Sequence, residues 1–117
     1  MLSSEGVTLI ATRCHLALHA MNTSRGTAST SMTLLEVTLA TRLLADMGYG
    51  AICDSAICEA ARAIKRAVSS GLANGPWGFT NEDSSAISYI LEIFERQLKE
   101  APAPDIESAF KETTSLI

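Results

Sequence analysis

The stretch TLLEVTLATRLLADMGYG, residues 33–50, decides the fold class, because apolar side chains surround the helix that it predicts. Thr33 and Glu36, three residues apart, form a capping-box pattern that opens a helix running to about Met47. Gly48 then ends it, since glycine is favoured just past a helix C-terminus. Its apolar positions are Leu34, Leu35, Val37, Leu39, Ala40, Leu43, Leu44 and Met47. A helix that is apolar nearly all round is central in a bundle, or it is half of a dimer interface.

On the N-terminal side, periodic apolar positions predict a first helix from Ser3 or Ser4 to about Met21. Leu9 and Leu16 widen its apolar stripe and suggest contacts with two neighbours. Residues 22–31, NTSRGTASTS, are all small or polar and predict a flexible linker with nothing to pack into a core.

On the C-terminal side, an alanine-rich stripe predicts a third helix over about 52–70, stopped by Gly71. Thr80 and Asp83 repeat the capping pattern and open a fourth helix that ends near residue 101. Asp105 caps a short last segment through Phe110, and residues 111–117 are expected to be a frayed tail. The expected fold is therefore all-α, a compact single-domain bundle (1–117) of four main helices plus a short C-terminal helix.

The overall composition agrees with this expectation. Apolar residues make up 47% of the 117 residues and aromatic residues only 5%, so the core is aliphatic, which favours helices over a β-sandwich. Three cysteines are an odd number, and neither a secretory leader nor a run of about 18 apolar residues is present. We therefore expect a cytoplasmic protein with free thiols and without a membrane partner.

The charge is acidic and unevenly distributed. The net charge is −4, and residues 79–117 carry eight acidic and three basic side chains. Proteins that bind nucleic acid normally carry a basic excess, so nucleic acid is disfavoured as a partner. The main exception is a basic cluster of Arg62, Lys65 and Arg66 on the third helix. If that helix is the second of a helix-turn-helix, this cluster would contact phosphates. Otherwise the three side chains are solvated, and their positive charges near the helix C-terminus interact favourably with the helix dipole.

Few residues of the sequence are candidates for catalysis or metal binding. His15 and His19 lie one helical turn apart, a spacing that suits a metal, but no third ligand accompanies them. Cys14 stands next to His15, yet adjacent helical residues point about 100° apart and do not form a catalytic dyad. Cys53 and Cys58 are interpreted as small buried apolar residues. We therefore expect no cofactor and no enzyme, and a metal- or thiol-dependent enzyme ranks last among the alternatives.

The stretch GLANGPWGFTNED, residues 71–83, places the only tryptophan among turn residues. Phe79 precedes the Thr80 cap, where an apolar residue packs against the helix that follows. Trp77 is either a lid folded over the end of the bundle or an exposed anchor for a partner, because tryptophan is enriched at interface hot spots.

These observations favour a non-enzymatic protein-interaction module, such as a small adaptor, regulator or inhibitor. Its expected partner-binding residues are Trp77, Phe79, Glu92 and Glu95. A homodimer that shares the helix over 33–47 is a second expected association. The alternative function is a DNA-associated regulator that uses Arg62, Lys65 and Arg66.

Overall fold

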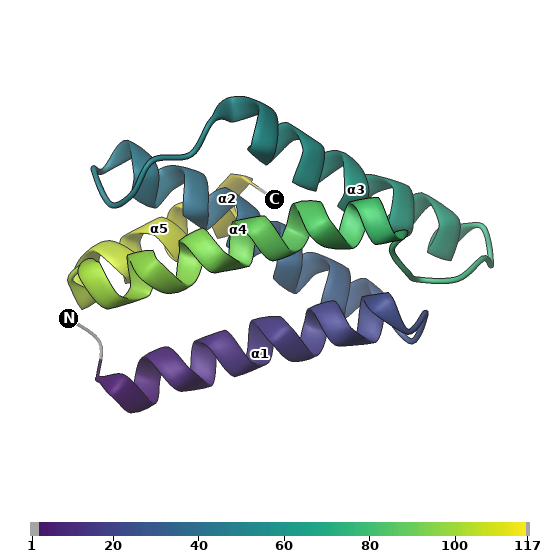
Figure 1. Cartoon of the computed structure of the whole chain (residues 1–117), viewed down its shortest axis with the longest axis horizontal. Helices are drawn as coiled ribbons and strands as arrows, with labels where there is room; N and C mark the ends of the chain where they lie inside the picture. Colours follow the sequence, from purple (N-terminus) through teal and green to yellow (C-terminus); the bar gives the residue numbers. More distant parts are fainter. Residues whose placement is uncertain (1–2, 117) are drawn as a thin grey trace.

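A computed structural model describes residues 3–116, which form five α-helices and no strand (Figure 1). The predicted all-α bundle is confirmed. The helices are α1 (Ser4–Asn22), α2 (Ala28–Asp46), α3 (Asp54–Leu72), α4 (Asn81–Glu100) and α5 (Ala103–Leu116). Within this described part of the chain, no helix is both long and apolar enough to cross a membrane.

The helix α2 lies at the centre of the bundle and contacts all four other helices. Its apolar circumference is therefore covered within one chain, and of its larger apolar side chains only Met47, at its C-cap, is clearly exposed. Thr38 and Thr41 are buried on this helix because their hydroxyl groups donate to the carbonyl groups one turn earlier. Leu35, Leu39 and Leu43 of this helix are only half-buried in the single chain, so the homodimer predicted through α2 stays a prediction.

The connection between α1 and α2 is shorter than the linker predicted over 22–31. Thr27 and Thr30 cap α2 reciprocally: each hydroxyl accepts a hydrogen bond from the other residue's backbone N–H, at 3.2 Å and 2.8 Å. The helix thus begins at Ala28, five residues before the predicted start. Ser31 is fully buried against Met21, so small polar residues of this stretch do pack in the core. Their size allows α1 and α2 to approach closely, which the composition of the stretch alone did not indicate.

The core is aliphatic around one aromatic pair. Phe94 of α4 is fully buried and meets Phe110 of α5 edge to face, with ring centroids 5.8 Å apart. Gln97 is also buried, and its side-chain Nε2 donates to the backbone carbonyl groups of Thr41 and Tyr49. This amide ties α4 to the C-terminal end of α2 and to the residues that follow it.

The exposed face of α1 differs from the prediction. Leu9 and Leu16 do not widen the buried stripe, because their side chains are 72% and 64% exposed. The buried face of α1 is narrower and consists of Cys14, Ala17, Leu18 and Met21. It packs mainly on α2 and α4, so the helix needs no wider stripe.

The last helix is longer than predicted. Residues 111–116 continue α5 and are not frayed, because Thr113 is fully buried against the bundle; residue 117 lies outside the described part. Asp105 does not cap this helix. It lies in the first turn of α5, where its carboxylate accepts a hydrogen bond of 2.6 Å from the Tyr49 hydroxyl. This bond raises the pKa of Tyr49.

Both ends of α3 also differ from the prediction. Cys53 is the exposed N-cap residue of the helix and Cys58 is exposed too, so neither is a buried apolar residue. At the other end the helix continues past Gly71 to Leu72. Gly71 is thus a helical residue and not the stop.

Candidate functional site

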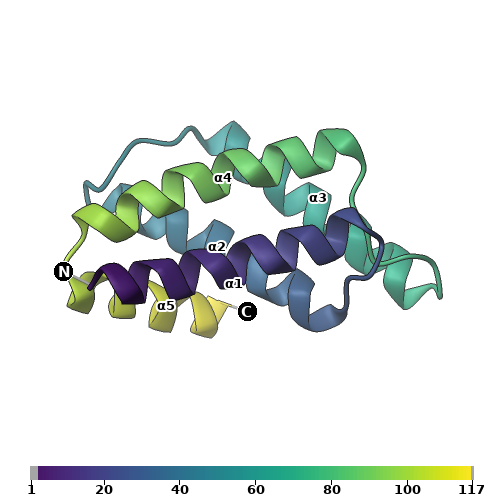
Figure 2. The same cartoon turned by 60° about the horizontal axis from the view of Figure 1, so that its bottom comes forward.

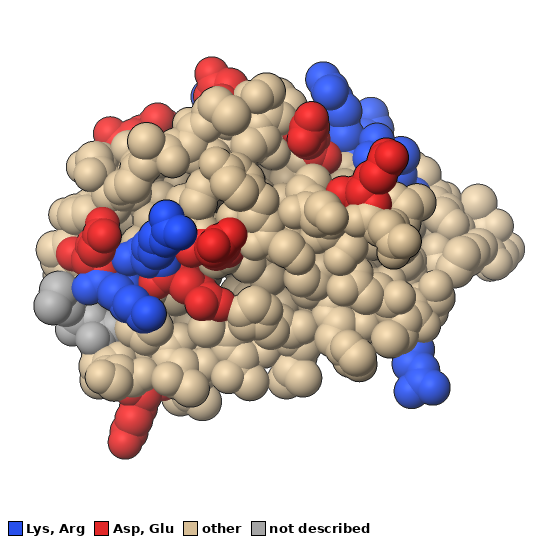
Figure 3. Space-filling model, in the orientation of Figure 1, with Lys and Arg blue, Asp and Glu red and all other residues tan. Residues whose placement is uncertain are grey.

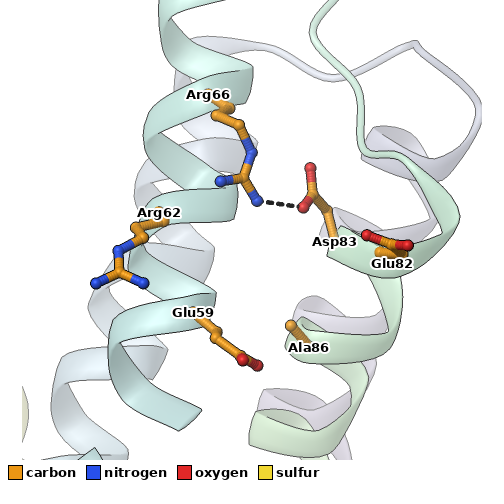
Figure 4. Close-up of a pocket in the computed structure, with 6 residues that line it drawn as sticks. All are labelled: Glu59, Arg62, Arg66, Glu82, Asp83 and Ala86. Atoms are coloured by element: carbon orange, nitrogen blue, oxygen red, sulfur yellow. Dashed lines mark hydrogen bonds and ion pairs between the residues drawn. The ribbon is translucent and has the colours of Figure 1, made fainter. Parts of the chain in front are cut away.

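The surface between α3 and α4 is hollowed into a groove, which we define by the residues of two adjoining cavities. The first, of about 240 Å³, is lined by Glu59, Arg62, Arg66, Glu82, Asp83 and Ala86 (Figure 4). The second, of about 540 Å³, is lined by Cys53, Ser55, Ala56, Glu59, Glu82, Ser85, Ala86 and Tyr89. Three residues, Glu59, Glu82 and Ala86, belong to both cavities. The groove therefore runs continuously along the two helices.

One end of the groove is closed by an ion pair. Arg66 of α3 donates to the carboxylate of Asp83 in the first turn of α4, with an N–O distance of 2.5 Å (Figure 4). The helix dipole favours an acidic residue at this position, and Asp83 also donates its backbone N–H to the Thr80 cap. The hydrogen bond to Asp83 raises the pKa of Arg66. This pair fixes how α3 and α4 are placed at this end.

The middle of the groove carries charged side chains that form no ion pair within residues 3–116: Glu59, Arg62 and Glu82. In Figure 4 the Glu59 side chain reaches from α3 toward Ala86 of α4, while Arg62 lies along α3. Two carboxylates and one guanidinium give this section an excess of one negative charge. A ligand with a basic group would meet complementary charge there.

The other end of the groove is less charged. Tyr89 is 48% exposed, and Ala56 and Ala86 form the wall beside it. Cys53 lies at this end, where its thiol is 3.2 Å from the Ser55 hydroxyl; this hydrogen bond lowers the pKa of Cys53. A half-exposed tyrosine beside two alanines offers a flat apolar surface with a hydroxyl group at its edge.

The three predicted phosphate-binding residues are only partly gathered here. Arg62 and Arg66 line the groove, whereas Lys65 is exposed and lines neither cavity. Arg66 is bonded to Asp83, and two further carboxylates lie in the same cavity. Figure 3 shows basic and acidic side chains side by side over this part of the surface. The structure thus gives this cluster no purely basic face.

The four predicted partner-binding residues do not form one surface. Trp77 and Phe79 lie in the loop before α4, where both are half-buried. Glu92 and Glu95 lie roughly 18 Å further along the helix, at 1.5 Å per residue. Glu92 pairs with Arg96 at 3.6 Å, as its spacing predicts. Glu95 is bonded to His15 of α1.

The loop with Trp77 is tied to the end of α1. The N–H of Phe79 donates to the carbonyl of Met21 at 3.0 Å, and the N–H of Gly26 donates to the carbonyl of Trp77 at 3.1 Å. Figure 2 shows this loop passing beside the α1–α2 turn. Phe79 packs against the core, as its place before the cap predicts.

The candidate metal and thiol residues are separated. His15 faces Glu95, whereas His19 is exposed without such a partner, and residues 3–116 contain no group of three potential metal ligands. Cys14 is buried, and burial raises the pKa of its thiol to about 11. A thiol with this pKa is almost entirely protonated at neutral pH and is a poor nucleophile.

Sequence reasoning missed the groove itself. Glu59, Arg62 and Arg66 recur at intervals of three and four residues, so one face of α3 is charged, and Glu82 and Ala86 show the same interval on α4. That signal predicts two helix faces, but not that the faces oppose each other. Comparison of the chain with protein-family models, with curated proteins and with solved structures gave no match.

Proposed function

We propose that this chain is a non-enzymatic protein-interaction module, an adaptor, regulator or inhibitor, that binds a segment of another protein in the α3–α4 groove. The observation that supports this proposal is the continuity of the two cavities through Glu59, Glu82 and Ala86. A trough between two helices accepts an extended or helical segment, a common form of peptide recognition.

The chemistry of the groove selects the bound segment. Its negative middle section favours a lysine or arginine that reaches Glu59 and Glu82. Its open end favours an aromatic or aliphatic side chain that stacks on Tyr89. Tyrosine and arginine are enriched among residues that dominate binding energy, and Tyr89 and Arg62 are the exposed examples here. The proposed ligand is therefore a segment with one basic and one apolar side chain near each other.

The other two hypotheses have less support. Binding to DNA would require Arg62, Lys65 and Arg66 together, but Arg66 is bonded to Asp83 and carboxylates flank the cluster. An enzyme that used Cys14 would need a thiolate, which burial disfavours. A cytoplasmic location also belongs to this proposal, since the exposed thiols of Cys53 and Cys58 remain free in a reducing compartment.

A displayed peptide library tests the proposal directly. Peptides selected on the immobilised protein should share a basic and an apolar position. In two-dimensional NMR spectra they should shift the amide signals of Ala56, Ala86 and Tyr89. The double variant Glu59→Lys/Tyr89→Ala, which removes both the carboxylate and the aromatic ring that the segment would contact, should lose about tenfold or more in affinity.

Leu116→Ala is the matched control, because it also truncates an exposed apolar side chain but on α5, away from the groove. It should leave the affinity unchanged. A protein-binding groove between α3 and α4 would be contradicted if no peptide were enriched. It would also be contradicted if the enriched peptides bound the double variant and Leu116→Ala equally well. Retention on heparin at moderate salt would instead favour the nucleic-acid alternative.

A further inference from the structure

A second surface, unrelated to the α3–α4 groove, lies on the outer face of α1. Leu9 and Leu16 are seven residues apart, so they lie on the same side of the helix two turns apart. Both side chains are mostly exposed, and Arg13 stands between them, four residues after the first and three before the second. Exposed leucines aligned in this way are typical of an interface.

An apolar cavity of about 240 Å³ lies between α1, α2 and α5, next to Arg13. Its walls are mainly apolar, and the buried thiol of Cys14 forms part of them. The lining residues are Ile10, Arg13, Cys14, Thr33, Glu36, Val37 and Phe110. By helix geometry Arg13 lies between the side of α1 that carries the two leucines and this hollow, which fits an aliphatic side chain.

The rim of this cavity carries two opposite charges. Arg13 of α1 is exposed and Glu36 of α2 is half-buried, and both line the cavity. Neither forms an ion pair with any other described side chain. Each charge is thus available to a group from outside the chain.

We propose that this face binds a second copy of the same chain around a two-fold axis. A two-fold interface uses the same patch on both copies, so the patch must complement itself. Protruding leucines beside an apolar hollow, and an arginine beside a glutamate, meet that requirement. A leucine of each copy enters the cavity of the other, and Arg13 of each copy faces Glu36 of the other. This interface is centred on α1 and includes Glu36 of α2, and it leaves the α3–α4 groove open.

Charge reversal provides a sharp test in sedimentation or light scattering. The unsubstituted protein should be a dimer at micromolar concentration. Arg13→Glu alone brings a glutamate against Glu36 at both contacts of the dimer. Glu36→Arg alone brings an arginine against Arg13 at both contacts. Each single variant should weaken the dimer about tenfold or more. An equimolar mixture of the two variants should form a heterodimer, since both contacts then join opposite charges.

Leu9→Glu/Leu16→Glu should also give a monomer with wild-type helicity, because both positions are exposed in the single chain. Leu72→Glu is the matched control on α3, at a side chain that is 74% exposed, and it should remain dimeric. A wild-type protein that stays monomeric at 100 µM would overturn the proposal. So would a dimer that survives the leucine and charge variants, or single variants whose mixture stays monomeric. Glu59→Lys/Tyr89→Ala should dimerise normally, so failure of the groove and failure of this interface are distinguishable.

Discussion

The indole ring of Trp77 occupies the space that a side chain at position 71 would need. A Cβ placed on Gly71 would lie 2.0 Å from Cε2 of Trp77, far inside van der Waals contact. The tryptophan is thus packed on the last turn of α3, and its carbonyl is bonded to Gly26 beyond α1. Of the two roles predicted for Trp77, the geometry supports the lid: the residue connects the ends of α1 and α3.

Gly71→Ala should destabilise the protein, although the same change in an open helix stabilises it. Alanine favours the helix by about 1 kcal/mol over glycine. Here the new methyl group would displace the indole, and overpacking of this kind costs about 1–3 kcal/mol. Chemical denaturation should therefore give a lower free energy of unfolding. Ser69→Ala, at an exposed position of the same helix end, is the control and should be neutral or slightly stabilising.

Trp77→Ala should lower the free energy of unfolding by about 2–3 kcal/mol, somewhat less than for a fully buried tryptophan, because the ring is only half-buried. The wild-type fluorescence should be blue-shifted and should move to the red in Gly71→Ala. Leu72→Ala, which removes an exposed neighbour, should change neither quantity. Unchanged melting of Trp77→Ala, with emission typical of a hydrated indole, would show that the residue is an exposed anchor.

Gln97→Glu should destabilise the bundle by about 3 kcal/mol or more at neutral pH. The amide donates hydrogen bonds to two carbonyl groups. A carboxylate in the same place would have no N–H or O–H group to donate to them, and its buried charge would be unpaired. The loss should shrink in acid, where the carboxyl group becomes protonated. Gln97→Leu should cost only about 1 kcal/mol, because it loses both hydrogen bonds but also removes a buried side-chain oxygen that has no partner. Equal stability of the two variants would contradict this account.

The buried thiol of Cys14 predicts a loss of stability in alkali. Its pKa is raised from 9.0 to about 11 in the folded chain, so folding favours the protonated form. This contribution is complete below pH 9 and is lost as the pH rises through 11. The stability difference between the wild type and Cys14→Ala should therefore shrink across that range. At pH 8 a thiol reagent should label the exposed Cys53 and Cys58 while Cys14 stays unmodified until the protein unfolds.

Local signals in the sequence were sufficient for most of the fold. The Thr80–Asp83 cap and the apolar stripe of α4 are both as predicted, because capping and helical periodicity depend on residues close in the chain. The start of α2 was predicted wrongly, since Thr33 and Glu36 imitate a cap that Thr27 and Thr30 in fact form. Both patterns are locally plausible, and burial of Ser31 against Met21 selects the earlier one.

Features that depend on contacts between helices were harder to predict. Gly71 has the sequence signature of a helix stop, and only the ring of Trp77 explains why a glycine is needed inside α3. The groove depends on α3 and α4 lying side by side, held by Arg66 and Asp83, which are 17 residues apart. The helix faces are encoded locally, whereas their mutual placement is a property of the whole bundle.

The central position of α2 has a consequence for how the molecule opens. Since every other helix rests on α2, the loss of that helix removes a packing surface from all of them at once. Peripheral segments such as the ends of α1 and α5 can detach singly, whereas the amide protons in the middle of α2 exchange with solvent only when the entire chain opens. Those protons therefore report the global unfolding equilibrium, and a ligand that protects them further must bind the native bundle as a whole.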